Sequence, residues 1–165
     1  MRATISIRVL ESPEQASAGA VYESDSVSPG LIEIAAGDGS GVPYDAILQL
    51  GDDSSDAAHL FVVGIELEPG HEADFEDWYN TEHLPALAQV PGVNGARRYR
   101  RAGSSGESGH DYPEYLALYA IASPDIAGNE DWRAAVETPW TVRLRPHFRA
   151  VWRGGYRLSR ASDRP

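Results

Sequence analysis

The stretch LFVVGIELEPGHEADFEDWYNTEHLPALAQVPGV, residues 60–93, contains two hydrophobic periods and the turns that bound them. Leu60 to Glu68 is a nearly continuous apolar run, as in a buried strand, and Pro69-Gly70 follows it as a turn. From Glu72 onward the spacing becomes helical. One broad face then carries Phe75, Trp78, Tyr79, Glu82, His83 and Ala86. Because Pro85 lacks a backbone N–H, we expect the helix to kink or end near residues 81–87.

The pattern after residue 93 completes a known order of elements. Val93 to Arg101 and Glu114 to Ala122 are predicted strands, and short helical segments follow from residue 123 to residue 144. Phe148 to Leu158 is the last predicted strand, with Phe148, Ala150 and Trp152 on one face. The order is therefore strand, helix, strand, strand, helix, strand. It predicts an α+β, ferredoxin-like antiparallel sheet with its helices on one face.

The upstream part of the chain resembles a reduced copy of this unit. Ala3 to Leu10 is strand-like, residues 28–31 resemble residues 90–93, and residues 43–48 resemble residues 113–118. We infer a degenerate repeat in residues 1–57 that keeps three strands and few helices; the alternative is an unrelated hairpin. The predicted division is 1–57 for the half-repeat, 58–160 for the full unit and 161–165 for a flexible tail.

The predicted sheet also needs partners for its open surfaces. Its uncovered face should pack on a second sheet, within one chain or across a homodimer. We predict a homodimer, because a sheet edge and the Trp-rich C-terminal segment need cover.

Composition and charge exclude several classes of function. The chain has no Cys, so it has no disulfide and no thiolate metal site. Its formal net charge is −11, and the acidic first half argues against nucleic acid as a partner. All 14 basic residues are Arg, so there is no Schiff-base lysine. No apolar run of membrane-spanning length and no secretory signal are visible, so we expect no membrane association and a cytoplasmic location.

The motif DFEDWYNTEHLP at residues 74–85, with VPGV at residues 90–93, resembles the dimeric α+β barrel superfamily. The resemblance points to its EthD-like branch, and residues 138–157 resemble the closing part of actinobacterial relatives. It implies a sheet curved over an apolar cavity beneath the helices. Relatives include polyketide cyclases, cofactor-independent monooxygenases and haem-binding proteins. The polyketide cyclases use a His and a Tyr in such a cavity, and His83 and Tyr79 are the matching residues here.

His83 and Tyr79 are the predicted catalytic pair. An imidazole titrates near neutral pH and suits general acid or base catalysis, and Tyr79 lies one helical turn earlier. Tyr79 can hold an enolate oxygen as a hydrogen-bond donor. Phe75 and Trp78 would wall the pocket. The alternative is that His83 caps a kinked helix end by bonding a free carbonyl.

Three further residues are predicted to bind substrate. Arg97 and Tyr99 lie two apart on a strand and can hold a carboxylate or phenolate; the alternative is an ion pair of Arg97 with the acidic helix. His147 begins the last strand and can reach the cavity mouth, or else makes a structural hydrogen bond. The five His residues show no close ligand spacing, so no metal site is predicted.

These residues predict a cofactor-independent enzyme of bacterial secondary metabolism. The predicted reaction is a proton-transfer-driven cyclisation, dehydration or isomerisation of a polyketide-like, hydrophobic or aromatic small molecule. The alternatives are a cofactor-free monooxygenase, a non-catalytic binding or assembly subunit, and a haem-binding protein. Asn80 and Trp78 match the monooxygenases poorly, because they are near neighbours that face different sides of one helix.

Overall fold

The computed structural model describes residues 4–24, 26–37, 39, 41–52, 56–103 and 111–162, and its eight strands form a closed antiparallel barrel. The strands are β1 (Thr4–Val9), β2 (Ala20–Glu23), β3 (Leu31–Ala36), β4 (Val42–Gly51), β5 (His59–Leu67), β6 (Val93–Arg101), β7 (Tyr115–Ile121) and β8 (Phe148–Arg160). The α-helices are α1 (Glu72–Trp78), α2 (Leu84–Ala88), α3 (Glu130–Val136) and α4 (Pro139–Leu144). A π-helical segment, η2 (Tyr79–His83), joins α1 to α2, and 3₁₀ turns occupy Pro13–Gln15, Pro124–Ile126 and Arg145–His147.

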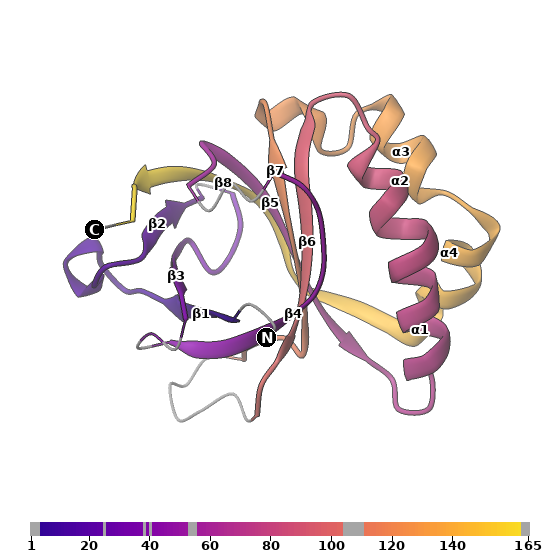
Figure 1. Cartoon of the computed structure of the whole chain (residues 1–165), viewed down its shortest axis with the longest axis horizontal. Helices are drawn as coiled ribbons and strands as arrows, with labels where there is room; N and C mark the ends of the chain where they lie inside the picture. Colours follow the sequence, from indigo (N-terminus) through magenta and orange to yellow (C-terminus); the bar gives the residue numbers. More distant parts are fainter. Residues whose placement is uncertain are drawn as a thin grey trace.

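The predicted α+β, ferredoxin-like architecture is confirmed for the second half of the chain. Its elements follow the expected order, and its strands lie side by side as β8, β5, β7 and β6. All four helices pack outside this half of the barrel, so they cover one face of its sheet (Figure 1). The other face looks into the barrel, where the strands of residues 4–51 cover it.

The first half of the chain supplies four strands, one more than the sequence predicted. The extra strand, β2, is only four residues long, and so short a run has little detectable period. The four strands lie in the order β4, β1, β3, β2. If the four strands of each half are numbered 1 to 4 along the chain, both halves have the spatial order 4-1-3-2.

The sequence similarities that suggested a repeat paired each strand of the first half with the wrong strand of the second half, because β2 had not been predicted. They aligned β3 with β6 and β4 with β7, whereas the shared strand order aligns β3 with β7 and β4 with β8. The division at residue 57 and the repeat itself stay predictions. Residues 104–110 lie outside the described part of the chain, as do residues 163–165 of the predicted tail.

Strand β7 shows how one sheet serves two cores. Its seven residues are all buried and alternate in direction. Leu116, Leu118 and Ala120 face the barrel interior, and Tyr115, Ala117, Tyr119 and Ile121 face the helices. The barrel core and the helix-side core therefore share β7 as their wall.

A shift of register in β8 corrects one predicted face. Gly64 of β5 pairs with Trp152 and the next residue, Ile65, pairs with Ala150, so one extra residue of β8 sits between them. As a result Phe148 and Ala150 lie on the helix side, whereas Trp152 packs inside the barrel. The predicted common face for these three residues is wrong, because an inserted residue reverses the direction of the side chains that follow it.

The sheet edge that suggested a homodimer is covered within the chain, because the barrel is closed. In the Trp-rich C-terminal segment, Trp132 and Trp152 are buried and Trp140 is partly exposed. Val142 is the large hydrophobic residue most clearly exposed among the described residues. The homodimer stays a prediction that a sheet edge no longer supports. In the described part of the chain no helix has the length and apolar character needed to cross a bilayer.

The seam between β4 and β6 joins the two halves and gives a test of barrel closure. Gly51 pairs with Gly95 at this seam, has φ of +76°, and an added Cβ would lie 2.6 Å from the backbone oxygen of Asn94. Gly70 has φ of +94° but no atom within 4 Å of such a Cβ. Gly70→Ala should cost about 1 kcal/mol of unfolding free energy through backbone strain alone. Gly51→Ala should cost about 2–4 kcal/mol, because strain and backbone collision add.

Urea unfolding of the two variants measures this difference. Equal losses of unfolding free energy for Gly51→Ala and Gly70→Ala would contradict the close packing of Gly51. They would mean that the β4–β6 seam moves apart to accept a methyl group at no energetic cost.

Candidate functional site

A cavity of about 520 Å³ lies between the helices and the outer face of the sheet. We call it the helix-side cavity. Aromatic and aliphatic side chains make most of its wall, and polar groups lie toward its rim. It is lined by Phe61, Val63, Ile65, Trp78, Tyr79, His83, Leu87, Tyr119, Gly128, Trp132, Arg133, Val136, Glu137, Thr141, Arg145, Phe148, Ala150 and Arg153. This volume and this apolar wall suit an aromatic small molecule.

The π-helical segment η2 places three of the predicted residues together. Pro85 was expected to kink or end the helix near residues 81–87; the helix continues, but a π turn distorts it there, and the Leu84 N–H bonds to the carbonyl of Tyr79, five residues earlier. Pro85 has no N–H to offer the carbonyl of Thr81, and the wider turn accommodates that missing bond. A π turn holds an extra residue, so residues five apart come onto one side. Trp78 and His83 therefore stack, with ring centroids 4.3 Å apart.

The His83 imidazole sits between two aromatic rings at the cavity wall. Trp78 stacks on it, and Tyr79 meets it edge-on at 4.9 Å. Its Nδ1 atom is buried and has no hydrogen-bond partner among the described residues. Burial, together with the positive charges of Arg98 and Arg145, lowers the pKa of His83 to about 3. His83 is therefore neutral near pH 7, and it does not cap the helix end through a carbonyl as the alternative proposed.

Two buried tyrosines offer a hydroxyl to the cavity. The oxygens of Tyr79 and Tyr119 lie 3.3 Å apart, and both side chains line the cavity. Burial raises the pKa of both phenols, so both keep their protons at neutral pH. Only one O–H is used in the bond between them. The other O–H is available as a donor to a bound molecule.

The buried guanidinium of Arg98 holds the π turn against the sheet. Arg98 comes from β6 and is 1% exposed. It donates to the Glu76 carboxylate at 2.7 Å and to the Asn80 side chain at 2.8 Å, and it lies over the Tyr79 ring at 4.6 Å. The acidic helix is thus paired as the sequence suggested, but with Arg98 in place of Arg97.

Polar side chains behind the wall fix the Trp78 ring. Its indole N–H donates to Thr141 at 3.0 Å, and Thr141 is 3.0 Å from the hydroxyl of Thr138. Thr138 in turn donates to Glu82 at 2.7 Å and caps α4. The network joins α4 to η2, so the rings at the cavity wall are held from the helix side.

The structure brings three predicted site residues to the cavity, packs a fourth behind them and places the other three elsewhere. Trp78, Tyr79 and His83 line the helix-side cavity. Phe75 is fully buried behind Trp78 and Tyr79 and supports the wall without lining it. Tyr99 packs in the barrel core, on the opposite face of the sheet.

Arg97 also lies on the barrel side of β6. It acts electrostatically on Tyr22, which is part of the barrel core. Because side chains alternate along a strand, Arg98 rather than Arg97 faces the helices. Arg97 and Tyr99 therefore lie away from the helix-side cavity, whatever their role.

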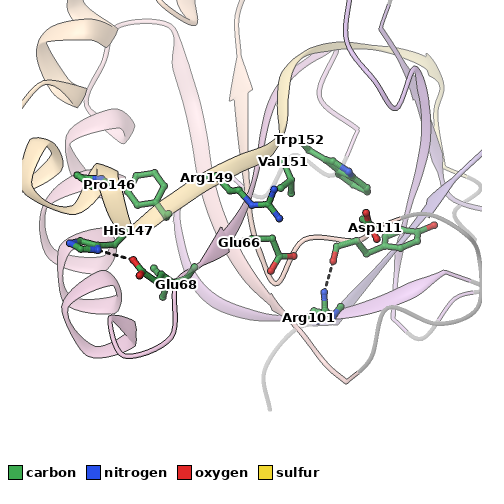
Figure 2. A pocket seen from close by; sticks show the side chains of 12 residues that line it. Glu66, Glu68, Arg101, Asp111, Pro146, His147, Arg149, Val151 and Trp152 are labelled. Carbon is green, nitrogen blue, oxygen red and sulfur yellow. Dashed lines mark hydrogen bonds and ion pairs between the residues drawn. The ribbon is translucent and has the colours of Figure 1, made fainter.

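His147 lies in a different pocket, which we call the polar pocket (Figure 2). This pocket has a volume of about 890 Å³ and opens where β5 and β8 leave the barrel. The His147 Nδ1 is 2.9 Å from the Glu68 carboxylate, which matches the predicted structural hydrogen bond. That bond also lowers the pKa of Glu68. Glu66, Arg101, Asp111 and Arg149 line the rest of the pocket (Figure 2).

Sequence reasoning missed four aromatic wall residues: Phe61, Tyr119, Trp132 and Phe148. Tyr119 was within reach, because Tyr115 and Tyr119 recur at even spacing on one strand. Phe61 and Trp132 belong to segments that come together only through the sheet and α3, where their rings meet at 5.3 Å. No spacing within either segment indicates this contact.

The low pKa of His83 predicts a contribution to acid sensitivity. Between pH 6.5 and pH 3 the unfolded chain binds a proton at His83 that the folded chain refuses, so stability falls as pH falls. His83→Gln removes this term. From pH 7 to pH 4.5 the wild type should lose about 2 kcal/mol more unfolding free energy than His83→Gln. Urea unfolding at both pH values measures it, and equal losses would contradict a buried neutral imidazole.

Comparisons with known proteins place the fold. No family model and no curated protein matches the chain in sequence. A ferredoxin-fold protein from Listeria monocytogenes, described as related to antibiotic biosynthesis monooxygenases, superposes with a TM-score of 0.62 at 11% identity, over 95% of this chain and 94% of that one.

Two further solved structures are similar in fold. An anthrone oxidase-like protein superposes with a TM-score of 0.53 at 13% identity, over 95% of this chain and 90% of that one. A haem-degrading enzyme from Listeria monocytogenes gives 0.55 at 8% identity, over 93% and 98%. These likenesses establish that the chain has the ferredoxin-like fold that the dimeric α+β barrel resemblance implied.

Proposed function

We propose that the chain is a small-molecule enzyme that binds an aromatic, polyketide-like compound in the helix-side cavity and moves a proton on it. The observation that carries the proposal is the neutral His83, held between Trp78 and Tyr79 with its Nδ1 buried and unpartnered. A buried polar atom without a partner is costly in a folded protein. His83 also lines the cavity, so a bound molecule can exchange a proton or a hydrogen bond with the imidazole.

The charges around the cavity favour an anionic form of the substrate. Arg98 and Arg145 lower the pKa of His83 because they disfavour imidazolium. The same positive potential stabilises a phenolate or enolate. Because His83 is unprotonated at neutral pH, it can accept a proton from an acidic C–H or O–H, and the substrate anion then serves as the counterion of imidazolium. The hydroxyl that Tyr79 and Tyr119 leave unused can donate to the anionic oxygen.

The weak basicity of His83 suits reactions that return the proton. A proton taken from carbon is readily given back to an oxygen or a second carbon of the same molecule. Cyclisation, dehydration and isomerisation proceed in this way and need no electron acceptor. Phe61, Trp132 and Phe148 would stack on the flat faces of the substrate.

A second candidate function is oxygenation without a cofactor. It is favoured by the fold neighbours described as monooxygenase-related and as anthrone oxidase-like. Here the same enolate would transfer its electrons to O₂, which would be the co-substrate. Consumption of O₂ by the apoprotein with its substrate would favour this reaction over cyclisation.

Deuterium exchange tests the shared proton-transfer step before the substrate is known. Anthrone and 2-tetralone are enolisable aromatic ketones of suitable size, and ¹H NMR in anaerobic D₂O follows the loss of their acidic C–H signal. The wild type should accelerate exchange. His83→Gln should reduce the acceleration by about 100-fold or more, because it removes the base. Tyr79→Phe should reduce it by about tenfold, because Tyr119 can still offer one hydroxyl.

His59→Gln is the matched control, since His59 lies on β5 away from the cavity. It should exchange at the wild-type rate. Quenching of tryptophan fluorescence reports binding, because Trp78 and Trp132 line the cavity. Binding without any acceleration would support a non-catalytic binding subunit, and full exchange by His83→Gln would remove His83 from the mechanism.

A further inference from the structure

Three metal-ligating side chains from two segments of the chain meet beside the polar pocket. Glu68 and His71 belong to the turn between β5 and α1, and His147 lies just before β8. One ligand atom from each lies within 4.8 Å of the other two. The two imidazole rings are stacked, with centroids 3.8 Å apart and planes 16° apart. Glu68 and His71 are three residues apart in sequence, whereas only the fold brings His147 to them.

The backbone holds this cluster in place. The Glu68 N–H donates to the carbonyl of His147 at 2.8 Å and so ties the end of β5 to the start of β8. Gly70, with φ of +94°, turns the chain so that His71 returns beside Glu68. The first turn of α1 then fixes His71, whose carbonyl accepts from the Phe75 N–H at 2.9 Å. The three backbone positions are thus set without any ion.

The ligand atoms already point toward one another. Oε2 of Glu68 is 2.9 Å from Nδ1 of His147 and 3.9 Å from Nε2 of His71. Two neutral imidazoles and one carboxylate suit a divalent transition metal such as Zn²⁺. A tetrahedral ion with bonds of about 2.0–2.2 Å needs its ligand atoms about 3.3–3.5 Å apart. All three side chains are partly exposed, so they can turn by the small amount required, and the stacked rings would splay.

We propose that Glu68, His71 and His147 form a binding site for Zn²⁺ or a similar divalent transition metal. Three protein ligands leave one coordination position open, as in sites that also bind water or substrate. Glu68 and His147 line the polar pocket, so a ligand in that pocket can reach the open position (Figure 2). The site is separate from the helix-side cavity and does not depend on its function.

Competition with a chromogenic zinc chelator tests the site on the full chain without an affinity tag. The wild type should bind one Zn²⁺ at this site. His71→Gln, His147→Gln and Glu68→Gln should each weaken binding by at least about tenfold, because each removes one of three ligands. His59→Gln is the matched control and should bind as the wild type does. Circular dichroism shows that each variant is folded.

A second measurement identifies the ligands directly. Addition of Zn²⁺ should shift the ¹H–¹⁵N imidazole signals of His71 and His147 and leave those of His59 unchanged. The proposal is overturned if the wild type binds no Zn²⁺ at millimolar concentration. It is overturned equally if the three ligand variants keep the wild-type affinity, since the ion would then bind elsewhere.

Discussion

The candidate cavity depends on one buried cation. Arg98 is the anchor between the sheet and the π turn, through Glu76, Asn80 and the ring of Tyr79. Burying an arginine costs several kcal/mol unless its donors are satisfied, so Glu76 and Asn80 must face it. That requirement fixes the rotation of the helix about its own axis. With the helix in this rotation, the side chains that face the space between helix and sheet are those of Trp78, Tyr79 and His83.

The π turn and Arg98 act together on His83. The wider turn brings both Trp78 and Tyr79 onto the imidazole; burial lowers the pKa of His83, and the positive charge of Arg98 adds to this effect. A regular helix would have carried Trp78 away from His83. Extra residues of this kind are frequent at functional sites, where they cost helical hydrogen bonds and change the direction of side chains.

The two histidine sites differ in their surroundings. His83 lies among aromatic rings and cations, where its charged form is disfavoured. His71 and His147 are partly exposed and lie beside the carboxylate of Glu68. The same side chain therefore suits proton transfer in one place and metal binding in the other. Both sites involve the strand pair β5 and β8. Residues of these strands line the helix-side cavity, and Glu68 and His147 lie next to their ends.

The sequence by itself determined the order of elements from residue 59 to residue 160. Apolar runs, helical spacing and turn residues are local properties, and they place β5, α1, β6, β7 and α3 within a few residues. Residue type and short spacing were enough for these features. The cavity was indicated by the resemblance of the motif around His83 to the dimeric α+β barrel superfamily.

Tertiary structure decided the rest, since it depends on contacts between distant segments. The four-residue β2 exists because β3 and β8 bind it on both sides. The extra residue in β8 reverses Trp152, and strand alternation gives the helix-side role to Arg98 in place of Arg97. The π turn joins Trp78 to His83, and the pairing of β5 with β8 brings His147 to Glu68 and His71. A one-residue shift changes which face a side chain occupies, and only packing against distant strands fixes that register.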